Sequence, residues 1–297
     1  MNMNRNRRLA DFFASTWMKS GMYLLLSVPL LITIGLLWKA FPILDKHSFT
    51  DLIFSGKWAP TKGEFGFLPF IYSSAYVTLL SFIFSAPLCL LAAIYLTQFA
   101  QKRLLAFMMP VIDILAGIPS VIYGVWGVLV IVPLVSVYVA PFFNVTSSGY
   151  SLLSGGVVLA VMCIPYMLNM LIEVFQTIPV GMKEASLSLG ATDWEMVKHV
   201  IIRKGFPGII SAFGLGIAKA FGETIAVLMV VGNTLHISAS PFSSGYPLPA
   251  LIANNYGEMM SIPDYDSALM FSALLLFVII LIFNLFFRYF IHKTERS

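Results

Sequence analysis

The stretch that decides the fold runs from Lys183 to Asn233, and it joins two unlike segments. Residues 183–195 read KEASLSLGATDWE and are polar, whereas residues 208–231 read GIISAFGLGIAKAFGETIAVLMVV and are almost entirely apolar. The apolar segment nevertheless carries Lys219 and Glu223. Charged side chains at membrane depth are costly and are functional by default. The stretch therefore predicts a docking module on the water side and functional charges inside the membrane.

The composition outside this stretch is that of an integral membrane protein. The chain is 59% hydrophobic and 11% charged, and its mean hydropathy is +0.87. A soluble protein carries about twice that charged fraction, and a spanning helix needs roughly 20 apolar residues. We predict an all-α, polytopic membrane protein with six transmembrane helices, at residues 21–41, 70–100, 104–132, 152–175, 208–231 and 268–291.

Lysine and arginine are distributed unequally between the two sides of the predicted membrane. Most lie before the first apolar segment, after the second and fourth, and in the tail. Cytoplasmic loops are enriched in these residues, so both termini are predicted to be cytoplasmic. The chain divides into a cytoplasmic N-terminal segment (1–20), a membrane domain (21–291) with a cytoplasmic loop (176–206), and a cytoplasmic tail (292–297).

The N-terminal segment has its own helical pattern. Leu9, Phe12, Phe13 and Trp17 recur at helical spacing with charged residues between them. This pattern fits a short helix lying in the inner membrane surface. An ordinary cytoplasmic extension of the first spanning helix fits it nearly as well.

Ionisable residues inside the apolar segments are candidates for a pathway. Asp113 lies well inside the third segment, where we expect it to be buried. Lys219 and Glu223 are four residues apart, so on one helix they would stand one turn from each other. They either form a structural pair or provide a site for an anion. Beside them runs a ladder of small residues that favours close helix packing, formed by Ala212, Gly216, Ala220 and Thr224.

Two further local signals concern chain breaks and docking. Pro119, in the sequence AGIPS at 116–120, predicts a kink or break, because proline lacks a backbone N–H and clashes with the preceding turn. In the loop at 176–206, Gly190 predicts a turn between two short helices. The loop is expected to offer a partner protein an apolar face made of Leu187, Trp194, Val197 and Ile201.

Several classes of protein lack support in the sequence. It contains no phosphate-binding loop, no metal-ligand spacing among its four histidines, and no nucleophile motif. Cys89 and Cys163 lie in apolar runs and are read as small buried hydrophobic residues. We therefore expect a protein that is not an enzyme and that uses no cofactor, metal or nucleic acid.

The docking module resembles the EAA loop of ABC-importer permeases, which docks on an ATPase subunit. That family pattern is E-A-A, three residues, G, nine residues, then I-x-L-P. Here Glu184, Ala185, Ser186 and Gly190 match it, with serine in place of the second alanine, and Arg203 stands in place of the proline.

Two more motifs are similar to phosphate permeases of the PstC type. Residues 118–127, IPSVIYGVWG, resemble their third-span signature, and residues 218–227, AKAFGETIAV, resemble their R-A-x-G-E-T-x-A-V segment, with Lys219 for arginine. The resemblance implies a phosphate path flanked by Lys219, Glu223, Thr224 and Asp113. Glu223 is expected to hold Lys219 in place and to limit how tightly the anion binds.

The resemblance also implies the fold and the partners. The fold would be the MetI-like fold of ABC importers, in a bacterial inner membrane. The partners would be a second permease subunit, two ATP-binding subunits, an extracytoplasmic phosphate-binding protein and membrane lipid. The alternatives are a permease for another oxyanion, such as molybdate or sulfate, and an ion-coupled secondary carrier. A carrier of that kind usually shows repeat-related broken helices, and no internal repeat is visible here.

Overall fold

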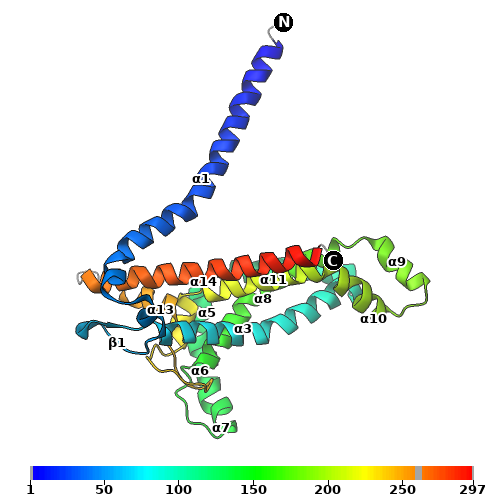
Figure 1. Cartoon of the computed structure of the whole chain (residues 1–297). Coiled ribbons are helices and arrows are strands. Elements are labelled where there is room, and N and C mark those ends of the chain that lie inside the picture. The colour runs from blue at the N-terminus through cyan, green and yellow to red at the C-terminus, as the bar shows by residue number, and fades with distance from the viewer. Residues whose placement is uncertain (1–2, 258–262, 296–297) are drawn as a thin grey trace.

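The structure, a computed structural model, describes residues 3–257 and 263–295 and is an elongated bundle of helices (Figure 1). Within these residues, six helical segments are long and apolar enough to cross a membrane, which confirms the predicted number. They are Ala10–Lys46, Leu68–Phe99, Ser120–Phe142, Leu152–Gln176, Asp193–Phe221 and Asp264–Lys293.

Most of the described chain is helical, and several helices continue into one another. The α-helices are α1 (Met3–Lys46), α2 (Phe49–Phe54), α3 (Leu68–Ile94), α4 (Lys102–Gly117), α5 (Ser120–Trp126), α6 (Val132–Leu134), α7 (Ala140–Phe142), α8 (Leu152–Gln176), α9 (Val180–Ser188), α10 (Asp193–Met196), α11 (Ile202–Phe221), α12 (Ile225–Val230), α13 (Leu248–Asn255) and α14 (Pro263–Glu295). A 3-10 turn lies at Pro60–Lys62, and wider π turns lie at Tyr95–Phe99, Gly127–Ile131, Val135–Val139 and Val197–Ile201.

A small antiparallel hairpin lies at one end of the bundle. Its strands are β1 (Trp58–Ala59) and β2 (Glu64–Phe65), with Trp58 opposite Phe65. The Trp58 ring packs edge-on against Phe67 and Phe70. Burial of these rings anchors the hairpin on the bundle.

The centre of the bundle is formed by α3, α8, α11 and α14, which run alongside one another (Figure 1). Small residues allow this close packing. A Cβ added to Gly216 would lie 2.3 Å from Met167 Sδ of α8, and one added to Gly214 would lie 2.6 Å from Phe287 Cγ of α14. Ala212, Gly216 and Ala220 of the predicted ladder are all buried. This part of the ladder is therefore a surface on which the neighbouring helices pack.

The third spanning helix differs from the prediction. α4 ends at Gly117, and Ile118 adopts an extended conformation with φ −67° and ψ 127°. A proline disfavours the helical conformation in the residue before it, so Pro119 breaks the chain as predicted. The helical segment that follows runs from Ser120 to Phe142. The predicted range 104–132 therefore combined nearly all of α4 with the first half of the next helical segment.

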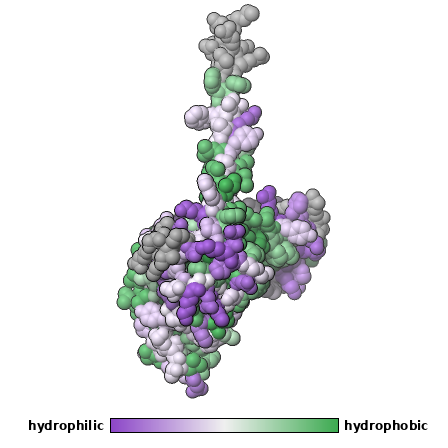
Figure 2. All heavy atoms as spheres, turned by 60° about the vertical axis from the view of Figure 1, so that its left-hand side comes forward, coloured by the Kyte–Doolittle hydropathy of each residue, from purple (hydrophilic) through white to green (hydrophobic). Residues whose placement is uncertain are grey.

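The N-terminal helix is continuous and largely unaccompanied. α1 bends along its length, and its first half projects clear of the other helices (Figure 1). The segment before residue 21 extends the spanning helix and is not a separate surface helix. Near its other end α1 packs on α14, where Ala40 and Ile43 are buried and Lys39 pairs with Asp266. Figure 2 shows the largely apolar arm above an end of the bundle where hydrophilic side chains gather.

Candidate functional site

The fifth predicted membrane helix is interrupted between Lys219 and Glu223. α11 ends at Phe221 and α12 begins at Ile225, so the two charges do not stand one turn apart on one helix. Lys219 lies in the last turn of α11, and Glu223 lies just before α12. A helix favours a cation at its C-terminus and an anion at its N-terminus. Each charge is therefore stabilised by the helix end beside it.

Glu223 does not hold Lys219 in place, which corrects that expectation. No ion pair joins the two side chains within the described ranges. The Glu223 carboxylate instead accepts a hydrogen bond from the backbone N–H of Ala226, at 3.3 Å. This contact satisfies one of the free amides in the first turn of α12. Thr224 is half-buried, and its hydroxyl donates to the Gly222 carbonyl oxygen at 3.4 Å.

The side chain that contacts Lys219 is an aromatic ring on α8. The Lys219 ammonium nitrogen lies 2.8 Å from the centre of the Tyr166 ring. A cation above an aromatic face is attracted by the negative charge density of the ring. Sequence reasoning missed Tyr166, because it lies 53 residues before Lys219 and no local motif marks it.

Two tyrosines fasten the break between α4 and α5. The Tyr166 hydroxyl donates to the Ala116 carbonyl oxygen at 2.7 Å, and the Tyr123 hydroxyl donates to the Leu115 carbonyl oxygen at 2.8 Å. These carbonyls belong to the last turn of α4, and that of Leu115 also accepts the Ile118 N–H at 3.3 Å. Tyr166 therefore connects the break after α4 to the charge at the end of α11.

Asp113 was predicted to be buried, but it is exposed on the surface of this chain. Its neighbour Ile112 takes the core-facing position and is 2% exposed. The Asp113 carboxylate accepts a hydrogen bond from the Asn169 side-chain amide at 2.9 Å. Because Asn169 stands three residues after Tyr166 on α8, the two side chains share one face of that helix.

These contacts define one polar face on α4, α8 and α11, made of Asp113, Tyr166, Asn169 and Lys219. Asp113 is exposed and the other three are half-buried. A carboxylate or an ammonium on the surface of a spanning bundle faces protein or water and not lipid. The polar face is therefore suited to lining a water-filled path for an anion, with Lys219 as its positive charge.

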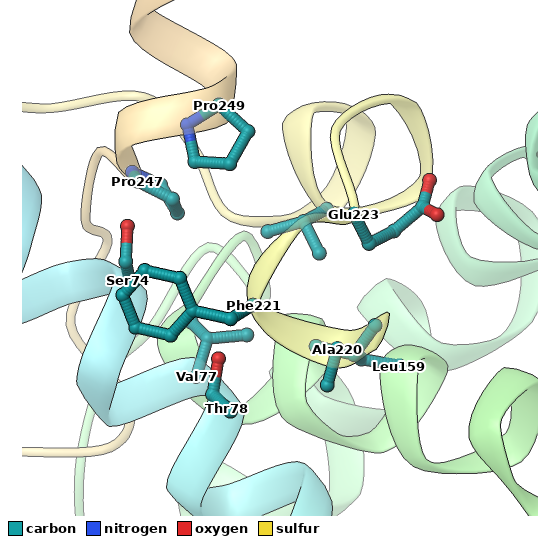
Figure 3. Close-up of a pocket in the computed structure, with 10 residues that line it drawn as sticks. Ser74, Val77, Thr78, Leu159, Ala220, Phe221, Glu223, Pro247 and Pro249 are labelled. Atoms are coloured by element: carbon teal, nitrogen blue, oxygen red, sulfur yellow. The ribbon is translucent and has the colours of Figure 1, made fainter. Parts of the chain in front are cut away.

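A cavity beside the α11–α12 break is too small for an anion. Its volume is about 10 Å³, and Ser74, Thr78 and Phe221 are among its lining residues. That is room for about one water molecule. Glu223 also lines this cavity, and Figure 3 shows its carboxylate directed away from Ser74, Pro247 and Pro249. Lys219 is not one of the lining residues.

The predicted docking module forms two short helices and a turn, as its glycine indicated. α9 ends at Ser188, and Gly190 has φ +87°. The Ala191 N–H donates back to the Ser186 carbonyl oxygen at 3.3 Å. This left-handed glycine after a helix end is a common way to satisfy its last carbonyls. The next helix starts with a reciprocal cap between Thr192 and Glu195.

The exposed surface of this module differs from the predicted one. Val197 and Ile201 are fully buried in the core of this chain and cannot contact a partner. Leu187 and Trp194 are exposed, as expected, but Leu189 at the turn is 89% exposed and protrudes furthest. Glu184, Ala185 and Gly190 are exposed, and Ser186 is half-buried. Burial lowers the pKa of the neighbouring Lys183 ammonium.

The helix that follows the docking module does not stop at Arg203, where the permease pattern has proline. It also continues through Pro207. The chain is helical without interruption from Asp193 to Phe221, over 29 residues. The docking module and Lys219 are therefore connected by one helical rod.

Comparison with known proteins assigns the chain to a class. Residues 85–296 match the family described as the inner membrane component of binding-protein-dependent transport systems. In a solved structure of the MetNI methionine ABC transporter, the matching chain has a TM-score of 0.57 at 19% identity. The match covers 75% of this chain and 93% of that one, and it confirms the predicted ABC-permease fold.

The relatives in sequence narrow the class. The phosphate transport system permease protein PstC of Xylella fastidiosa is 32% identical over 284 residues, covering 91% of this chain and 87% of the relative. The probable ABC transporter permease YqgH of Bacillus subtilis is 33% identical over 293 residues, covering 97% and 93%. The chain therefore belongs to the family of binding-protein-dependent inner membrane permeases, in the group that includes the PstC proteins.

Proposed function

We propose that this chain is a permease subunit of an ATP-driven importer of inorganic phosphate. Phosphate crosses the membrane along the polar face, and a second permease subunit covers that face. The complex holds two ATP-binding subunits, one of which docks on α9 and the Gly190 turn of this chain, and a phosphate-binding protein delivers the anion at the opposite end. The chain itself carries out no hydrolysis, and both termini are cytoplasmic.

The observation that carries the proposal is the position of the polar face. It lies on the surface of the chain, where α4, α8 and α11 meet, and it holds an exposed carboxylate and a half-buried ammonium group. An uncovered charge at the centre of a membrane helix costs about 2.5–3.5 kcal/mol on insertion scales. A second permease and a water-filled path remove that cost, which supports a pathway between two subunits.

The rod from Asp193 to Phe221 gives the coupling a physical route. Its 29 residues span about 40 Å at ~1.5 Å per residue. When the ATP-binding subunits close, they push the module that contains Glu184, and the rod carries that movement to Lys219. The bundle then alternates between inward-open and outward-open states.

The chemistry of Lys219 suits transport of an anion. An ammonium group attracts phosphate as a point charge but lacks the two-pronged geometry of arginine. Lys219 accordingly makes one point contact with phosphate, and that contact is easily broken. A permease must release the anion as readily as it accepts it, and one lysine meets both requirements.

The experiment that tests the function is uptake of radiolabelled phosphate by a strain lacking this chain. Reintroducing the chain is expected to restore uptake, and an excess of unlabelled phosphate is expected to compete. If sulfate or molybdate competes as well as phosphate, the importer serves another oxyanion. If uptake persists without an ATP-binding subunit, the chain is an ion-coupled carrier.

A further inference from the structure

The side chain of Tyr166 makes two contacts that no other described residue combines. Its ring lies under the Lys219 ammonium group, and its hydroxyl is bonded to the end of α4. We propose that Tyr166 is a positioning residue that holds Lys219 when no anion is bound. Phosphate then competes with the ring for the same ammonium group. This inference rests on the proposed function, because it assumes that Lys219 binds the anion.

The ring contact sets a threshold for anion binding. With the Tyr166 ring 2.8 Å from its nitrogen, Lys219 is already stabilised by an electrostatic partner. An arriving phosphate must exceed the attraction of that ring before the ammonium group moves to it. Cation–π attraction of usual strength would weaken phosphate binding between about 2-fold and about 30-fold. The ring thus limits the affinity in the way first expected of Glu223.

The hydroxyl contact is one of two bonds that tie the helix carrying the ring to α4. The bond from the Tyr166 hydroxyl to the Ala116 carbonyl oxygen anchors the far end of the side chain on α4. One turn further along α8, the Asn169 side-chain amide donates a hydrogen bond to Asp113 of α4. Two bonds therefore tie α8 to α4 near the ring, and the bond of Asn169 remains in a variant that lacks the hydroxyl.

The arrangement also makes the contact sensitive to conformation. Lys219 moves with the rod that begins at Asp193, whereas the ring is held by α8 and α4. Movement of the rod relative to α8 separates the ammonium group from the ring. The affinity of Lys219 for an anion consequently depends on the state of the transporter.

The test is equilibrium binding of radiolabelled inorganic phosphate to the purified transporter complex without its binding protein. Tyr166→Leu and Tyr166→Phe both lack the hydroxyl, and only the phenylalanine keeps an aromatic face. Tyr166→Leu is expected to bind phosphate between about 2-fold and about 30-fold more tightly. Tyr166→Phe is expected to stay close to the unmodified complex. Equal affinities for these two variants would overturn the proposal.

Two controls separate this inference from the proposed function. Tyr123→Phe removes a similar bond to a carbonyl of α4 without touching Lys219, so phosphate affinity is expected not to change. Lys219→Gln is expected to abolish binding. If Lys219→Gln binds normally, the proposed function is wrong. If it fails to bind while Tyr166→Leu matches Tyr166→Phe, only the role of Tyr166 is wrong.

A second variant and a second measurement guard against misfolding. Tyr166→Met fills the space with a flexible apolar side chain and is expected to behave like Tyr166→Leu. Amine-selective labelling read by mass spectrometry reports the Lys219 ammonium directly. Its reactivity is expected to rise in the leucine and methionine variants but not in Tyr166→Phe. Unchanged reactivity in all three would contradict the ring contact.

Discussion

Lys219 and Glu223 lie at the facing ends of two helices and do not bind each other. Lys219 closes α11, where the free carbonyls favour a cation, and Glu223 opens α12, where its carboxylate accepts the Ala226 N–H at 3.3 Å. The membrane segment is therefore a broken helix with one charge at each side of the break. This leaves Lys219 free of a carboxylate partner and available to an anion.

The hydrogen bond that Glu223 makes to the start of α12 and its negative charge can be tested separately by two substitutions. Glu223→Gln keeps a side-chain oxygen for the Ala226 N–H, whereas Glu223→Ala removes it. We expect Glu223→Ala to lower the free energy of unfolding by about 1 kcal/mol. Glu223→Gln is expected to lose less stability and to bind phosphate more tightly, because a negative charge has been removed. Thermal unfolding in detergent and phosphate binding measure the two effects. Equal destabilisation by both variants would show that the cap is unimportant.

The turn at Gly190 requires a left-handed backbone. Asparagine adopts this conformation more readily than other side chains, so uptake is expected to fall in the order glycine, asparagine, alanine, valine. An added Cβ meets nothing within 4 Å, so crowding does not explain such an order. ATP-driven uptake and co-purification of the ATP-binding subunit measure the effect. If Gly190→Val retains both, the turn is not part of the docking element.

Leu189 is expected to be an anchor of the docking surface because it is apolar and 89% exposed. Leu189→Asp should abolish co-purification of the ATP-binding subunit, since a charge would enter an apolar contact. The matched control is Leu235→Asp, which places the same change in an exposed position beyond α12. It should leave co-purification intact. Loss of the ATP-binding subunit in both variants would indicate general misfolding.

Glycines on α11 allow its neighbours to approach closely. A Cβ at Gly208 would lie 2.5 Å from both methyl carbons of Val174, a side chain that is stiff at its first torsion. Gly208→Ala is therefore expected to cost about 1–3 kcal/mol of stability. Gly181→Ala, where nothing lies within 4 Å, should be neutral or slightly stabilising. The midpoint of thermal unfolding compares the two, and equal midpoints would contradict the close packing.

Among the breaks in the membrane helices, only the one that a proline marks was predictable. Pro119 identified the break after α4, because its ring constrains Ile118. The break at Gly222 has no proline, and apolar residues continue beyond it, so the segment resembled one helix. The end of α11 is set by tertiary packing, because α12 buries Ala226, Val227 and Val230 in the core.

The partners of the charged residues could not be predicted from the sequence, because they also depend on tertiary packing. The contact of Lys219 with Tyr166 joins two helices, and nothing in the order of residues selects that tyrosine among twelve. The burial of Val197 and Ile201 likewise follows from packing of the rod on the inner core, which includes Phe175. The types of residue were visible in the sequence, and their neighbours were not.

The most direct test of the central claim is phosphate uptake by cells carrying Lys219→Gln, with Lys219→Arg and Lys62→Gln beside it. Lys62→Gln removes a lysine from the exposed turn between β1 and β2 and should transport normally. Lys219→Arg keeps the positive charge and should retain uptake. The account predicts no uptake by Lys219→Gln although the complex assembles in the membrane. Normal uptake by that variant would contradict it.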